Sequence, residues 1–160
     1  PSRRTFVWGL SIAALVLVLD QLSKWWVVST VMQPPRIIPV TPFFNLVLGW
    51  NKGISFGLFH GDSAFNVWGL PAIALIIVAL LLVWLWRSTG TLISIAIGFV
   101  VGGALGNVVD RIRYGAVADF LDFYAFGYHW PAFNLADMGI TLGAMLLIYD
   151  SLFGGEEIHN

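Results

Sequence analysis

Long apolar runs, separated by polar and aromatic connections, dominate the pattern along the chain. Four of them reach membrane-spanning length, at about residues 6–28, 66–86, 88–110 and 131–153. A helix of about 21 to 23 residues is roughly 32–35 Å long, which is enough to cross a ~30 Å hydrocarbon core with some tilt. Because backbone polar groups in lipid must be bonded within their own segment, we predict that each run is a helix.

The connections between these runs predict how the helices are arranged. Residues 87–90 alone join the second helix to the third, so these two form an antiparallel hairpin. The longer connections, residues 29–65 and 111–130, then share the opposite membrane face. The first has β-branched and aromatic runs broken by proline and glycine, which predicts short strands on the membrane surface. The second is dense in aromatic side chains, which are favoured at the headgroup level. We therefore expect a single all-α membrane domain over residues 1–160, with four transmembrane helices, a small β-rich loop region and an interfacial aromatic segment.

The composition favours the same class of protein. Hydrophobic residues make up 58% of the 160 residues and charged residues only 11%, whereas a soluble domain is nearer half apolar and a quarter charged. The net charge of −1, without blocks of like charge, gives no indication of nucleic acid as a partner. Since the chain has no cysteine, it has no disulfide, thiol nucleophile or thiolate metal site. No small-residue cleavage site follows the first run, so we expect a retained helix rather than a cleaved signal peptide.

Polar side chains gather toward the face that carries the two long connections. Counts of flanking Lys and Arg do not decide which face this is, but Arg3 and Arg4 favour a cytoplasmic N-terminus. The polar face would then be outside and both termini cytoplasmic. The residues placed on that face are Asp20, Lys24, Asn51, Lys52, Asn107, Asp110, Arg111, Asp119, Asn134 and Asp137.

Asp119 and Asp137 are the candidate catalytic residues. Carboxylates are costly in hydrocarbon, so aspartates at the edge of membrane-length segments indicate a functional site. Two carboxyls that share one proton can activate a water molecule and protonate a leaving group, which suits hydrolysis of a peptide bond. The alternatives are that either residue is a structural partner of Arg111 or Arg113, or an aspartate favoured near a helix start by the dipole. We place Asp137 about six residues into the fourth helix.

Other polar residues have spacings that predict supporting roles. Asp20 and Lys24 are four apart on one helix face, so we expect a structural ion pair. Asp110 and Arg111 point in different directions and should bind separate partners.

Two asparagines precede an aspartate by three residues. Asn107 and Asp110 share a helix face, as do Asn134 and Asp137, so each asparagine is expected to orient a carboxylate by hydrogen bonding. Asp122 is expected to be a solvated neighbour of Asp119.

Glycines recur every fourth residue at Gly98, Gly102 and Gly106, and again at Gly139 and Gly143. Such a pattern lets helices approach closely, either within the molecule or at a dimer face. We favour internal packing of the third and fourth helices, and hence a monomer.

Several other catalytic sites are excluded or disfavoured by their missing motifs. There is no His-Glu-x-x-His, and His60, His129 and His159 are too scattered for a metal site, so we expect no metal or cofactor. No Gly-x-Ser-x-Gly is present. Ser23 and Lys24 are adjacent and would diverge around a helix, which makes them an unsuitable nucleophile and base.

At this point five short motifs, in order, resemble those of lipoprotein signal peptidase, the bacterial type II signal peptidase. The resemblance spans nearly the whole chain, including the layout of four helices. The motifs are Asp20-Gln21-Leu22-Ser23-Lys24, Asn51-Lys52-Gly53-Ile54-Ser55-Phe56-Gly57, Gly106-Asn107-Val108-Val109-Asp110-Arg111, Val117-Ala118-Asp119-Phe120 and Phe133-Asn134-Leu135-Ala136-Asp137.

The resemblance implies an intramembrane aspartic endopeptidase at the outer face of the bacterial inner membrane. Its partners would be membrane lipid and diacylglyceryl-modified prolipoproteins, cut just before the lipidated cysteine. Asp119 and Asp137 fall where the family has its catalytic pair. The positions assigned to substrate binding or dyad support are Asn51, Asn107, Arg111 and Asn134, and those assigned structural polar roles are Asp20, Lys24 and Asp110.

Two other classes of function remain open from the residues alone. In a small proton- or cation-coupled carrier, Asp119 and Asp137 would relay protons. The one-sided polarity, and the lack of charge midway along the second and third helices, speak against it. A non-catalytic scaffold held by its glycine faces would leave the two aspartates unexplained.

Overall fold

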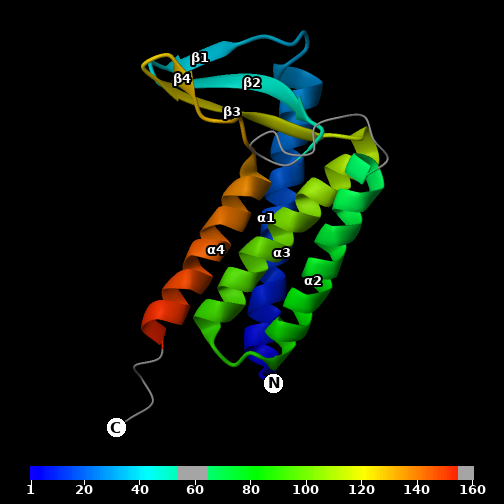
Figure 1. Ribbon diagram of the computed structural model, residues 1–160, viewed down its shortest axis with the longest axis vertical. Coiled ribbons are helices and arrows are strands. Elements are labelled where there is room, and N and C mark those ends of the chain that lie inside the picture. The colour runs from blue at the N-terminus through cyan, green and yellow to red at the C-terminus, as the bar shows by residue number, and fades with distance from the viewer. Residues whose placement is uncertain (54–64, 155–160) are drawn as a thin grey trace.

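The computed structural model describes residues 1–53 and 65–154, and within these ranges four long helices form the body of the molecule (Figure 1). Each of the four helices is long and apolar enough to cross a membrane. Two of them are extended by π-helical turns at the end that carries the sheet. The helical elements are α1 (Arg3–Trp26), η1 (Val27–Val31), η2 (Phe65–Gly69), α2 (Leu70–Arg87), α3 (Thr91–Tyr114) and α4 (Leu135–Phe153).

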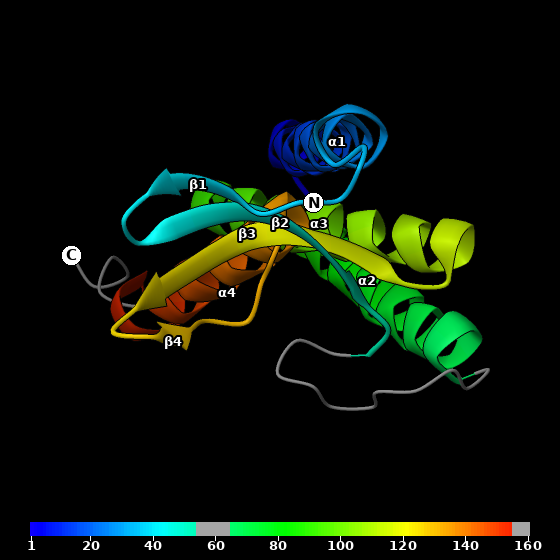
Figure 2. The same ribbon diagram turned by 90° about the horizontal axis from the view of Figure 1, so that it is seen from above.

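A four-stranded antiparallel sheet lies across the end of the bundle opposite the N-terminus (Figures 1 and 2). Its strands follow the chain order β1 (Ile38–Thr41), β2 (Phe44–Asn51), β3 (Val117–Ala125) and β4 (Tyr128–His129). The strands of the first long connection were expected, but β3 was not. The aromatic connection pairs with β2 and so joins both long connections in one sheet. The density of aromatic residues in this connection indicated a position at the membrane interface. It did not show whether the segment is irregular or a strand.

Helix boundaries differ from the expected ones where the chain meets this sheet. α3 continues to Tyr114 rather than ending at 110, and stops at Gly115, whose φ of 73° suits glycine. α4 begins at Leu135 rather than 131, because Phe133 bonds to Leu121 of β3 in both directions. Asp137 therefore lies in the first turn of α4 and not six residues into it. Residues 131–133 are apolar but not helical, so hydrophobicity alone did not mark where the helix begins.

Small residues let α3 approach both α1 and α4. A Cβ on Gly102 would collide with the Ala13 carbonyl of α1, and one on Gly103 with α4. Internal packing was expected, but between α3 and α4 alone, whereas Gly98 and Gly102 pack against α1. The four-residue spacing of glycines on one helix indicates a close contact with another helix, but it does not identify that other helix. α3 therefore runs through the centre of the bundle, and the polar ends of α1, α3 and α4 meet beneath the sheet.

Candidate active site

The first turn of α4 presents Asp137 through a reciprocal cap. Asn134 has extended backbone geometry, and its Oδ1 accepts the Asp137 N–H at 3.0 Å. Asp137 Oδ2 in turn accepts the Asn134 backbone N–H at 3.3 Å. This capping box satisfies two donors at the start of the helix. Asp137 is thus a helix-start aspartate, as the alternative interpretation expected. Only its Oδ2 takes part in the cap, because its Oδ1 accepts a hydrogen bond from Asn107.

Strand β3 brings Asp119 to the same asparagine. Asn134 Nδ2 donates to Asp119 Oδ1 at 2.9 Å, and Asp119 is only 4% exposed. Because the Asn134 side chain also accepts from the Asp137 backbone, one amide holds both aspartates in place. The two residues are 18 apart in sequence and come from a strand and a helix.

Asn107 of α3 supports Asp137 rather than Asp110. Its Nδ2 donates to Asp137 Oδ1 at 3.0 Å, while its Oδ1 accepts from Lys24 Nζ at 3.2 Å. The spacing argument paired Asn107 with Asp110 because they share one helix face. The close approach of α3 and α4 gives Asn107 a partner on the neighbouring helix instead.

The environment of Asp119 favours its protonated form. Burial, and after it the negative charge of Asp137, raise the pKa of Asp119 from its ordinary value to about 7. Hydrogen bonds from the Asn51 and Asn134 side chains, and the positive charge of Lys24, lower that pKa in part. A carboxyl with a pKa near neutrality can hold a proton and give it up, which is what an acid–base catalyst needs.

A buried ionic cluster anchors the backbone on both sides of the two aspartates. Lys24 Nζ lies 2.8 Å from Asp20 Oδ2, as the spacing predicted, and 3.0 Å from Asp110 Oδ2. Asp20 Oδ1 accepts the Ala136 N–H at 2.9 Å, and Asp110 Oδ2 accepts the Ala118 N–H at 3.1 Å. Ala136 precedes Asp137 and Ala118 precedes Asp119, so this cluster sets the position of both candidate residues.

Gln21 completes the cluster and had been given no role from the sequence. Its Nε2 lies 3.1 Å from each of three acceptors, namely Asp20 Oδ2, Asp110 Oδ1 and the Gly106 carbonyl. It is the residue after Asp20, within the first motif. A polar side chain near the end of a membrane-spanning helix was the available signal.

Asn51 and Arg111 both bond to the backbone of Gly53. Asn51 ends β2, contributes a hydrogen bond to Asp119, and accepts the Gly53 N–H at 2.9 Å. Arg111 donates to the Gly53 carbonyl, and among the described residues its buried Nε has no partner. Residues 54–57 of the same motif, together with His60 and His159, lie outside the residues that the structure describes.

Asp122 is not a solvated neighbour of Asp119. It is 8% exposed, accepts from Asn45 Nδ2 at 3.1 Å, and lies 2.7 Å from His129 Nδ1. Three residues along a strand bring a side chain to the opposite face of the sheet. Asp122 therefore belongs to a separate pairing away from the site.

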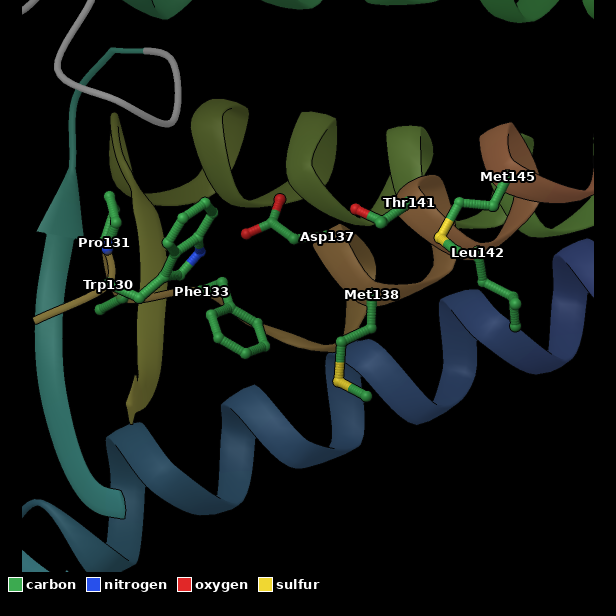
Figure 3. Close-up of a pocket in the computed structure, with 9 residues that line it drawn as sticks. Trp130, Pro131, Phe133, Asp137, Met138, Thr141, Leu142 and Met145 are labelled. Atoms are coloured by element: carbon green, nitrogen blue, oxygen red, sulfur yellow. The ribbon is translucent and has the colours of Figure 1, made fainter. Parts of the chain in front are cut away.

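Asp137 also faces a cavity of about 420 Å³ along α4 (Figure 3). Its other walls are mainly apolar. They are formed by Trp130, Pro131, Ala132, Phe133, Met138, Thr141, Leu142 and Met145. Within residues 1–53 and 65–154, no three His, Cys, Asp or Glu side chains gather closely enough to hold a metal ion.

Comparison with known proteins places the chain among membrane peptidases. The family model described as signal peptidase (SPase) II matches residues 12–153. A lipoprotein signal peptidase of Beijerinckia indica subsp. indica is 45% identical over 146 residues, which cover 91% of this chain and 87% of that protein. One from Cupriavidus pinatubonensis is 47% identical over 144 residues, covering 89% and 81% respectively.

A solved structure agrees with these sequence relationships. It is described as a bacterial membrane enzyme solved by the in meso method at 2.3 Å resolution. It superposes with a TM-score of 0.82 at 30% identity and covers 95% of this chain and 93% of its own. Because the family model matches residues 12–153 and relatives of 45–47% identity cover most of the chain, the chain belongs to the signal peptidase II family.

Proposed function

We propose that the protein is an intramembrane aspartic endopeptidase in which Asp119 and Asp137 form the catalytic dyad. The observation that carries this proposal is the single Asn134 side chain bonded to both residues. The pKa of about 7 for Asp119 supports a dyad that holds one proton at neutral pH.

In the proposed reaction Asp119 begins protonated and Asp137 ionised. Asp137 takes a proton from a water molecule whose oxygen attacks the scissile carbonyl carbon, and Asp119 gives its proton to the carbonyl oxygen. The resulting geminal diol collapses as the C–N bond breaks. Asp137 then gives its proton to the leaving nitrogen, and Asp119 recovers one from a hydroxyl of the diol. Both carboxyls return to their starting states.

The proposed substrates are prolipoproteins, cut immediately before a diacylglyceryl-modified cysteine. The relatives are named lipoprotein signal peptidases. A cleavage site tethered to the bilayer by its lipid would meet a dyad at the end of membrane-length helices without leaving the membrane. We propose that this end faces outward from the inner membrane, with both termini cytoplasmic.

The remaining candidate residues receive roles from their contacts. Asn51 and Asn107 each bond one member of the dyad and would orient it. Arg111 would hold the backbone in place at Gly53. The structural set that holds the backbone of the dyad is Asp20, Lys24 and Asp110.

The test is cleavage of a diacylglyceryl-modified prolipoprotein by the purified protein in detergent, with a chelator present. Asp119→Asn and Asp137→Asn are compared with the parent, and each is checked for folding by its thermal transition. Cleavage by the parent and none by the two folded variants would support the dyad. A folded parent that does not cleave, or a normal rate in either variant, would overturn the proposed dyad and favour the carrier hypothesis.

A further inference from the structure

A row of side chains runs down α4 from the proposed dyad. Asp137, Thr141 and Met145 are four residues apart and so lie one above another, each step rising about 6 Å. All three line the same cavity. Figure 3 shows them in sequence along the helix, with the hydroxyl oxygen of Thr141 turned toward the Asp137 end.

Thr141 is an exposed residue on the membrane-length helix α4. Among the residues that the structure describes it has no hydrogen-bond partner, whereas Ser94 Oγ donates to the Gly90 carbonyl one turn back at 2.8 Å. Such a backbone bond is the usual way for a helical hydroxyl to be satisfied. An unbonded hydroxyl facing hydrocarbon is unfavourable. Thr141 is therefore available to an acceptor that enters the cavity.

The surroundings of Thr141 restrict what that acceptor can be. One turn above it is the carboxylate of Asp137, and beside and below it are Leu142 and Met145, which are 43% and 61% exposed. A ligand that fits is polar near the dyad, carries an uncharged acceptor about one helical turn away, and continues as an alkyl chain. A cysteine whose sulfur bears a glycerol esterified with fatty acids has this order of groups.

We propose that Thr141 donates a hydrogen bond to an ester carbonyl of the diacylglyceryl group and so directs one acyl chain along Leu142 and Met145. This assignment rests on the proposed function. It makes Thr141 a specificity-determining residue that contacts the lipid part of the substrate, separate from the aspartates that carry out the cleavage.

The test compares two substrates of the same peptide sequence in an ester-free detergent. One carries the diacyl group and the other carries two ether-linked alkyl chains, which lack the carbonyls. Thr141→Val removes the hydroxyl at nearly constant shape, and Thr141→Ser keeps it. We expect Thr141→Val to raise KM for the ester substrate about five- to tenfold at unchanged kcat. This is the effect of losing one hydrogen bond that is equally strong in the bound substrate and in the transition state. KM for the ether substrate should not change, and Thr141→Ser should restore the parent KM.

Thr91→Val is the matched control, because Thr91 begins α3 at the opposite end of the bundle. It should leave both KM values unchanged. An unchanged KM in Thr141→Val, or an equal rise for both substrates, would overturn the role of Thr141 while leaving the peptidase proposal intact. If KM is unchanged in Thr141→Val but added ester lipid raises the thermal stability of the parent, the occupant of the cavity beside Thr141 is a bilayer phospholipid and not the substrate. A parent that cleaves neither substrate would overturn the proposed function and this assignment together.

Discussion

Asn134 Nδ2 donates to Asp119 Oδ1 at 2.9 Å while the same side chain caps the helix whose first turn carries Asp137. The stability of the helix start and the alignment of the two carboxyls thus depend on one residue. These two effects can be separated by choosing substitutions that preserve the cap and remove the reach to Asp119.

Asn134→Ser should separate capping from alignment. Serine is a good N-cap, so the free energy of unfolding should change by less than about 1 kcal/mol, whereas Asn134→Ala should lose about that much. The serine hydroxyl is too short to reach Asp119, so we expect kcat/KM to fall about 100-fold in both variants. Thermal unfolding and cleavage rates measure the two effects. Full activity in Asn134→Ser would contradict the proposed alignment.

The pH dependence of cleavage should have an alkaline limb near pH 7. Below the pKa of about 7, Asp119 holds the proton that the carbonyl oxygen needs. Above it both carboxyls are ionised, so kcat/KM should decrease as the pH rises, approaching tenfold per pH unit. The measurement is kcat/KM from pH 5 to 9 with folding verified at each pH. A rate that still increases at pH 9 would be inconsistent with Asp119 as the acid.

Asn51→Ala should move that limb to higher pH. The Asn51 hydrogen bond lowers the pKa of Asp119, so its removal raises that pKa and keeps the proton on Asp119 to higher pH. Asn45→Ala is the matched control from the same strand, because Asn45 bonds Asp122. Its pH profile should overlay that of the parent. Identical limbs in Asn51→Ala and the parent would refute the proposed role of Asn51.

Lys24→Gln should destabilise the protein strongly. It leaves Asp20 and Asp110 buried without their shared cation, which costs about 3–5 kcal/mol. Adding Asp20→Asn returns the cluster to its original net charge, and the new side chain can still accept the Ala136 N–H. We therefore expect the double variant to be more stable than Lys24→Gln alone. Unfolding free energies in detergent decide this, and equal losses would argue against an electrostatic cause.

Gly106→Ala should lower both stability and activity. A Cβ at this position would collide with the Asp20 carboxylate and also approach Ala136. The displaced carboxylate would release its bond to the backbone beside Asp137. Gly90→Ala is the control, because a Cβ there meets nothing closer than 3.7 Å and the φ of −81° suits alanine. Comparable effects of the two substitutions would show that close packing at Gly106 is not required.

Much of the fold follows from the sequence because a bilayer restricts what a chain can do. The hydrocarbon thickness sets the length of each helix, and unsatisfied backbone groups in lipid leave no alternative to helices for these runs. The cost of carboxylates in hydrocarbon likewise singled out Asp119 and Asp137 as candidates. The spacing of Asp20 and Lys24 predicted a pair within one helix, which the structure contains.

Only the tertiary structure decided which elements meet. Contacts between distant segments determine the pairing of β3 with β2 and the partner of Asn107. They also determine the role of Gln21 and which helix packs against each glycine. Periodicity places side chains on one face of their own element, and it carries no information about the element opposite. Asn134 lies three residues from Asp137 in sequence, but its bond to Asp119 exists because β3 crosses the start of α4.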